Sequence, residues 1–167
     1  MASTNRERGF SLVELMIVVA VLGILAALVL PELRGHTTEA KAAAAANNLH
    51  IFRAAIELYA AQHNAVAPGY LNGVVAPWTF PLQMTCYSDR NGNVASQPSS
   101  RFLHGPYLEE IPTNPFNNKK TVEILSDGED FPAEADGSFG WIYTPATKEV
   151  RLDAPGTDKN RRRYYDY

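Results

Sequence analysis

The chain has 167 residues, enough for one globular domain and hardly for two. Its formal net charge of −3 gives no overall attraction to nucleic acid or to an anionic membrane. The single cysteine, Cys86, excludes an intrachain disulfide scaffold, and we expect it to be a half-buried, inert thiol rather than one that pairs between chains.

The first predicted element is an apolar helix. No charged residue occurs between Leu15 and Leu30, and from Phe10 the apolar run covers about 21 positions, or roughly 32 Å of helix, which matches the hydrocarbon core of a bilayer. Arg6 and Arg8 precede the run and no positive excess follows it. We therefore expect a membrane span with a cytoplasmic N-terminus and the rest of the chain on the other side.

One carboxylate, Glu14, stands inside this run, where a charge costs about 2.5 to 3.5 kcal/mol. A cleaved secretory signal, with Ala26 and Ala27 near its cleavage site, and a plain signal anchor are two alternatives, but neither explains Glu14. If the chain began at Phe10, Glu14 would lie about 6 Å along the helix from the new amino group. The helix dipole favours a negative charge in that first turn.

Residues 6–15, RERGFSLVEL, resemble the processing site of type IV prepilins and type II secretion pseudopilins. The resemblance implies that a membrane prepilin peptidase cuts between Gly9 and Phe10 and N-methylates Phe10. It also implies that Glu14 pairs with the amino group of a neighbouring subunit, and that an inner-membrane assembly platform is a further partner.

The helix is predicted to continue beyond the apolar run. Gly23 and Pro31 are its weak points, because glycine and proline disfavour helix, and we expect local kinks there. In the resembling family the interval between these residues unwinds during assembly, so both are candidate melting points. We expect the helix to end near Asn64, before Pro68-Gly69.

The second half of this helix, residues 32–64, is predicted to be amphipathic. Its larger apolar residues recur in steps of four and three, which places them on one face that we expect to bury against a sheet: Ala45, Leu49, Phe52, Ile56 and Tyr59. His50, Arg53 and Glu57 lie off that face and are expected at the surface, and we expect the same of His63.

Residues 65–120 are predicted to form a loop region packed on the helix, with Trp78 and Phe80 as apolar anchors and a turn at Asn91-Gly92. Residues 121–125 alternate as a strand, and residues 140–152 indicate a hairpin turning at 145–148. One face of the hairpin is expected to cover the helical stripe: Trp141, Tyr143, Val150 and Leu152. The predicted fold class is α+β, a long N-terminal helix packed on a small antiparallel sheet, and pilin-like by resemblance.

The sequence contains no catalytic or metal-binding motif, so an enzyme is not expected and no cofactor is required. Asp89-x-Asn91-x-Asn93 opens like a calcium loop, but Val94 and Ser100 stand where an EF-hand needs Gly and Glu. Major pseudopilins bind calcium in a C-terminal loop. The acidic loop 126–137 therefore supplies calcium candidates, to be weighed against a solvated loop: Asp127, Asp130 and Asp136.

The tail, KNRRRYYDY, places basic residues beside tyrosines, a combination that can hold single-stranded nucleic acid. The same residues can equally edge a sheet or contact the next subunit. DNA is therefore an alternative partner, which a net acidic chain does not favour.

The resemblance of residues 6–15, together with the apolar helix that follows them, implies a structural subunit that forms a helical homo-oligomer, a type IV pilus-like filament. The expected regions are a leader at 1–9, a membrane or filament-core helix at 10–31, the amphipathic half at 32–64, the loop region at 65–120, and strands with the tail at 121–167. The chain would reside in a bacterial inner membrane, with its head in the periplasm, before entering an extracellular pilus. The alternatives are a pseudopilin whose periplasmic pseudopilus drives protein export, and a signal-anchored periplasmic binding domain.

Overall fold

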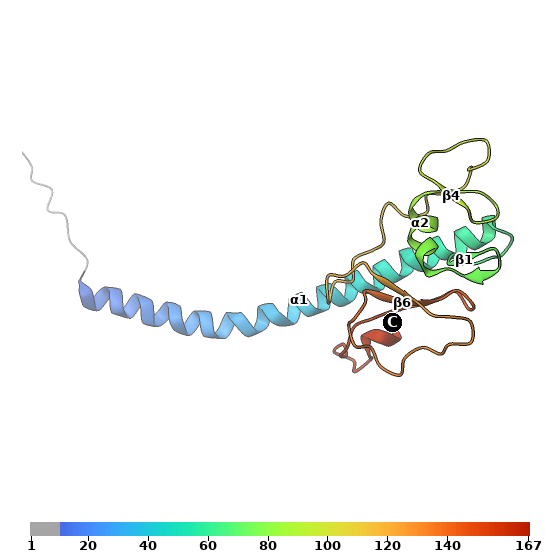
Figure 1. Cartoon of the computed structure of the whole chain (residues 1–167). Coiled ribbons are helices and arrows are strands. Elements are labelled where there is room, and N and C mark those ends of the chain that lie inside the picture. The colour runs from blue at the N-terminus through green and yellow to red at the C-terminus, as the bar shows by residue number, and fades with distance from the viewer. Residues whose placement is uncertain (1–10) are drawn as a thin grey trace, which may run out of the picture. The chain divides into compact units, whose positions relative to one another are not determined.

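The computed structural model describes residues 11–167, except for the side chains of residues 27–36. The chain divides into two units, residues 1–39 and residues 40–167. The helix α1, Leu12–Gln62, is continuous through positions 23 and 31 and belongs to both units (Figure 1). We call residues 40–167 the head.

Helix α1 ends two residues before the predicted Asn64. Asn64 and Ala65 adopt left-handed conformations, with φ of 56° and 65°. The amide of Ala65 donates to the carbonyl of Ala60 at 2.9 Å, which satisfies one of the free carbonyls at the helix end. The chain then turns back at Pro68-Gly69 toward the first hairpin.

The predicted loop region contains two small hairpins and a short helix. Strand β1, Tyr70–Leu71, pairs with β2, Val74–Val75. The 3-10 turn η1, Pro77–Thr79, leads directly into α2, Phe80–Thr85. Strand β3, Tyr87–Ser88, pairs with β4, Val94–Ala95, across the expected turn, where the amide of Gly92 donates to the Asp89 carbonyl at 2.9 Å.

The C-terminal strands form a sheet of order β5-β6-β7: β5 is Val122–Ile124, β6 is Trp141–Thr144 and β7 is Glu149–Leu152. The hairpin β6–β7 turns at residues 145–148, as predicted. Strand β5, however, runs parallel to β6, so the sheet is mixed and not wholly antiparallel. The loop between β5 and β6 carries the chain back to the end of the sheet at which β5 begins, so β6 runs in the same direction as β5.

The core of the head lies between α1, α2 and this sheet (Figure 1). The predicted helical stripe is buried, and so are the four predicted residues of the hairpin. The Phe52 and Trp141 rings meet edge to face at 5.6 Å, and the Trp141 indole nitrogen donates to the Pro112 carbonyl at 2.7 Å. Each large apolar side chain buried here contributes about 1.5 to 3 kcal/mol.

Two predictions about single side chains are wrong. His63 is 1% exposed, not a surface residue, because it follows the buried stripe of α1 by one further turn and its ring stacks on Tyr59. Trp78 is 66% exposed, not an anchor. The anchoring face of that segment is taken by Phe80 and Met84, which point to the core. His50 is exposed and Cys86 is half-buried, as expected.

Candidate functional site

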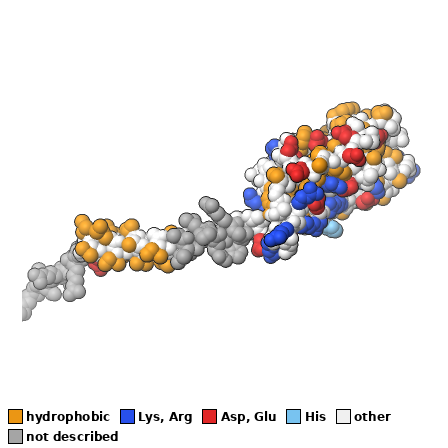
Figure 2. All heavy atoms as spheres, turned by 90° about the horizontal axis from the view of Figure 1, so that it is seen from below, with side chains coloured by type: hydrophobic (Ala, Val, Ile, Leu, Met, Phe, Trp, Pro, Cys, Tyr) orange, Lys and Arg blue, Asp and Glu red, His pale blue; other side chains and the backbone are white. Residues whose placement is uncertain are grey.

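The described apolar side chains of the first unit are exposed throughout residues 11–26. On the face that Figure 2 shows, hydrophobic side chains cover this part of α1. Glu14 lies in the first turn of the helix, where the amide of Leu15 donates to the Ser11 carbonyl at 3.1 Å. The predicted cleavage site, Gly9 and Phe10, lies outside the described residues. Among those residues, no helical stretch has the length and hydrophobicity that crossing a membrane requires.

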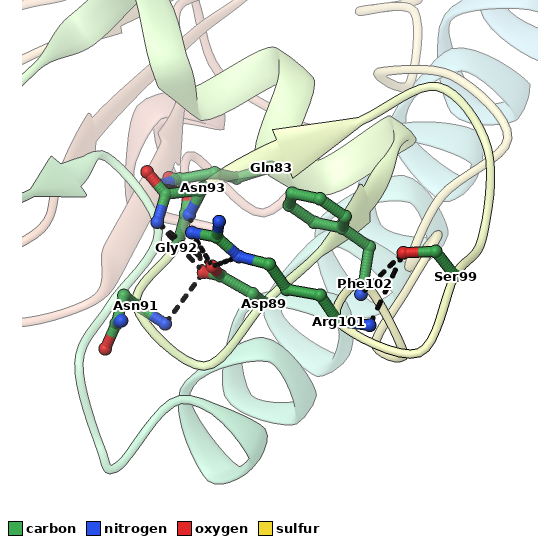
Figure 3. Close-up of polar contacts among 8 residues, drawn as sticks. All are labelled: Gln83, Asp89, Asn91, Gly92, Asn93, Ser99, Arg101 and Phe102. Carbon is green, nitrogen blue, oxygen red and sulfur yellow. Dashed lines mark hydrogen bonds and ion pairs between the residues drawn. The ribbon is translucent and has the colours of Figure 1, made fainter.

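Asp89 begins the segment that resembles the start of a calcium-binding loop, and its carboxylate accepts hydrogen bonds from the protein itself (Figure 3). One carboxylate oxygen accepts from the amides of Asn91 and Asn93 at 3.0 Å each. The other accepts from Arg101 Nε at 2.9 Å. Burial opposes the charged form, but the hydrogen bonds from Asn93 and Arg101 outweigh it and hold the pKa of Asp89 below its usual value. Both carboxylate oxygens are thus engaged in hydrogen bonds within the protein.

The carboxylates of the acidic loop, residues 126–137, do not form a cluster that could hold a metal ion. Asp127 accepts a hydrogen bond from the Tyr70 hydroxyl, which raises the pKa of Tyr70 to about 12. Asp136 accepts from the amide and hydroxyl of Ser138 at 2.7 and 2.8 Å. In the described part of the chain, no three His, Cys, Asp or Glu side chains lie close enough together to hold a metal ion.

The C-terminal tail packs on the head. Tyr164 and Tyr165 are buried, and the Tyr164 ring lies 4.1 Å from that of Phe116. Arg163 pairs with Asp166 at 2.7 Å, and Arg162 lies over the Tyr167 ring at 5.0 Å. These rings and cations therefore already make contacts within the chain.

Comparison with known proteins gives the context for these features. The model of the prokaryotic N-terminal methylation motif matches residues 4–30. Type II secretion system core protein G of Pseudomonas aeruginosa is 31% identical over 141 residues, which cover 81% of this chain and 89% of that protein. Core protein G of Vibrio cholerae is 30% identical over 152 residues, 87% of this chain and 92% of that protein. Type IV major pilin protein PilE1 of Neisseria gonorrhoeae is 30% identical over 166 residues, 91% of this chain and 79% of that protein.

This chain belongs to the pilin and pseudopilin family. It is accordingly a structural protein and not an enzyme. No solved structure matches it. The family resemblance of residues 6–15 is thus confirmed, and the fold agrees with the predicted pilin-like class.

The pilin head also depends on buried polar residues that the sequence did not single out. Gln83, which is fully buried, accepts from the amide of Gly69 at 2.7 Å and donates to the carbonyls of Tyr70 and Gly92 at 3.0 Å each. Asn114 donates to the carbonyls of Gly140 and Asp153 at 2.9 and 3.1 Å. Only the position of Gln83 within an apolar helix hinted at such a role, since a buried polar group needs partners.

Proposed function

We propose that this chain polymerises into a filament through α1, after prepilin peptidase removes residues 1–9. The observation that carries the proposal is an exposed apolar helix whose first turn contains one carboxylate, Glu14. Apolar side chains in water are unfavourable, so this half of α1 needs lipid before assembly and neighbouring helices after it. Glu14 would then meet the N-methylated amino group of Phe10 on a neighbouring subunit and set its register.

The replacement Glu14→Ala tests this role. We expect the variant to be inserted and processed, because cleavage occurs before Phe10, but to form at least about tenfold fewer filaments, since each contact loses an ion pair worth more than 1 kcal/mol in lipid. Electron microscopy and immunoblotting of sheared fibres provide the measurement. Ser11→Ala, an exposed change in the same region, is the matched control and is expected to assemble normally. Normal filaments from Glu14→Ala would overturn the register role.

The mature N-terminus tests the processing step. Mass spectrometry of the assembled protein is expected to find a chain that begins at Phe10 and carries one added methyl group. A chain that begins at Met1 or Ala2 would contradict processing and favour the signal-anchored alternative. Gly23 and Pro31 remain candidate melting points, which hydrogen exchange in assembled filaments can probe.

Between the two kinds of filament, we favour the pseudopilus. The two core protein G relatives described above are matched over 89% and 92% of their length, against 79% for the major pilin. Many pilins carry a pair of cysteines near their C-terminus, whereas this chain has a single cysteine, Cys86. Deleting the gene is expected to stop export of a type II secretion substrate while leaving surface fibres unchanged. Loss of long surface fibres with normal export would instead support the type IV pilus.

A further inference from the structure

Two neighbouring cavities open in the head near the end of α1. The smaller cavity has a volume of about 240 Å³ and is lined by three segments: the residues that follow α1, the turn between β1 and β2, and the turn between β3 and β4. The larger cavity, of about 410 Å³, extends to the β6–β7 turn and shares Val66, Tyr70 and Gly73 with the smaller one. We call the two cavities together the Tyr70 recess.

Tyr59 brings to the smaller cavity a polar group that the fold leaves without a partner. Its side chain is 1% exposed and its ring stacks on His63, but within the described chain its hydroxyl makes no hydrogen bond. Every fully buried side-chain nitrogen or oxygen of the described residues has a hydrogen-bond partner. An oxygen without a partner must therefore be accessible, and Tyr59 reaches the surface through the cavity that it lines.

Gly92 leaves this hydroxyl uncovered. A Cβ atom at position 92 would lie 2.9 Å from the Tyr59 hydroxyl oxygen and 2.9 Å from Gln83 Nε2. Burial raises the pKa of Tyr59, with Tyr107 and Asp89 adding to the effect, so the hydroxyl stays protonated. It can therefore donate one hydrogen bond to a ligand and accept another from it.

Four further polar side chains line the smaller cavity, and they come from all three segments: Asn64, Asn72, Arg90 and Asn91. Within the described chain, none of these four side chains makes a hydrogen bond or an ion pair. Figure 3 shows the Asn91 side chain pointing away from Asp89. Turn geometry explains an asparagine before a glycine in each hairpin, but it does not explain why these side chains and the Tyr59 hydroxyl converge on one cavity.

The recess has little net charge. Among the described residues that line the smaller cavity, Arg90 alone carries a full charge. The end of α1 lies beside it, and the partial negative charge at the C-terminal end of a helix offsets a cation. In the larger cavity, Asp127 and Lys148 have opposite charges and already interact with the Tyr70 hydroxyl and with Glu57. The recess therefore favours a neutral ligand over an ion.

We propose that the Tyr70 recess binds a neutral oligosaccharide, with one sugar ring in the smaller cavity and the next ring in the larger one. Each sugar hydroxyl both donates and accepts hydrogen bonds, as carboxamides and a phenol do. Tyr70 lines both cavities and offers an aromatic ring on which the C–H face of a sugar can pack. The smaller cavity lies below the range of about 300 to 1,000 Å³ that drug-sized ligands occupy, which suits a single ring.

This proposal concerns the head alone and does not depend on filament formation. Saturation-transfer-difference NMR of the full-length chain tests it, in a detergent without a sugar headgroup. The probes are cellobiose, lactose and N,N′-diacetylchitobiose, each compared with its monosaccharides. We expect at least one disaccharide to bind with a Kd of about 1 mM or tighter, and its monosaccharides to bind at least about threefold more weakly because they lose the contacts of the second ring.

Three results would overturn the proposal: no binding of any of the three disaccharides, equal affinity for the monosaccharides, or tighter binding of glucuronic acid, whose carboxylate makes it an anion. The first would remove the sugar site, the second would remove the role of the larger cavity, and the third would contradict the neutral character of the ligand.

Tyr59→Phe is the sharpest variant, because it removes only the hydroxyl that has no partner in the fold. Its unfolding midpoint is expected to equal that of the parent, while its affinity for the disaccharide falls about threefold to tenfold. Tyr143→Phe is the matched control. The Tyr143 hydroxyl donates to the Pro68 carbonyl at 3.1 Å, so this variant is expected to unfold at a lower temperature but to bind the sugar as the parent does. Parent affinity in Tyr59→Phe, or equal loss of affinity in both variants, would overturn the assignment of the sugar to this recess.

Discussion

His63 shows how one buried polar side chain joins distant parts of the head. Its Nδ1 lies 2.8 Å from the Tyr59 carbonyl oxygen, so Nδ1 carries the proton, and its Nε2 lies 3.0 Å from the Ser88 hydroxyl. The Tyr59 and His63 rings stack at 3.8 Å, and His104 faces His63 at 5.4 Å. Burial lowers the pKa of His63, with the His104 ring adding to the effect while Asp89 opposes it.

This environment predicts acid sensitivity. Because the pKa is lower in the folded state than its ordinary value of 6.5, the unfolded state binds the proton more readily. The stabilising contribution is therefore complete above pH 6.5 and is lost as the pH falls through this value toward the folded pKa. Thermal unfolding between pH 8 and pH 5 is the measurement, and the midpoint is expected to drop with acid.

The matched variants for this experiment are His63→Gln and His50→Gln. At pH 8, His63→Gln is expected to have a free energy of unfolding lower by about 1 to 2 kcal/mol, because its hydrogen bonds are altered, and therefore a lower unfolding temperature. Its unfolding temperature is also expected to depend less on pH. His50→Gln, a change at an exposed residue, keeps the parent profile. Equal pH dependence in the parent and His63→Gln would show that another group is responsible.

At the scale of elements, the C-terminal tail contacts strand β7, the acidic loop and helix α1. Arg151 of β7 lies over the Phe131 ring at 4.2 Å and the Tyr165 ring at 5.2 Å. The Tyr165 hydroxyl donates to the Pro132 carbonyl at 2.8 Å, which fixes the acidic loop. Arg53 of α1 donates to the carbonyls of Val150 and Tyr167 at 3.1 and 3.0 Å. The C-terminal segment is thus part of the fold.

Replacing Tyr165 with Ala is therefore expected to destabilise the head by about 3 to 5 kcal/mol, as for other large aromatic deletions in a core. Urea unfolding followed by near-ultraviolet circular dichroism gives the value. Tyr167→Ala, which removes a partly exposed ring, is the control and is expected to cost clearly less. A Tyr165→Ala variant with parent stability but impaired DNA binding would favour the nucleic-acid alternative instead.

At the scale of the whole molecule, the described hydrophobic core lies entirely within the head. One cluster extends from Ala42 to Tyr167 and the other from Leu125 to Tyr165, while the described side chains of residues 11–26 are exposed. The head is therefore stabilised by its own hydrophobic core. The exposed apolar side chains of the first unit instead need apolar surroundings, because they are not buried within the chain.

A chain of residues 40–167 is accordingly expected to fold and to remain soluble without detergent. Its unfolding midpoint should lie within about 4 °C of that of the head in the full-length protein, a difference of no more than about 1 kcal/mol for a domain of this size. Calorimetry of both forms makes the comparison. An unfolded or aggregated fragment would show that the first unit contributes to the stability of the head.

Features that depend on a local pattern could be predicted from the amino-acid sequence alone. The steps of four and three from Ala45 to Tyr59 fixed the buried face of α1, because helical geometry alone places those residues together. Alternating apolar residues on either side of a turn predicted the hairpin at residues 140–152, which the structure contains. The family followed from Gly9, Phe10 and Glu14, whose spacing relative to an apolar run is a short, contiguous signal.

Features that depend on which distant segment covers an element became evident only in the fold. The parallel pairing of β5 with β6, the burial of His63 beneath Ser88 and the outward position of Trp78 are all of this kind. A side chain's own polarity does not reveal them. His63 is buried because the Tyr59 carbonyl of its own helix satisfies one ring nitrogen and the Ser88 hydroxyl of the distant strand β3 satisfies the other. Trp78 is exposed because Phe80 and Met84 fill the space that the core offers to α2.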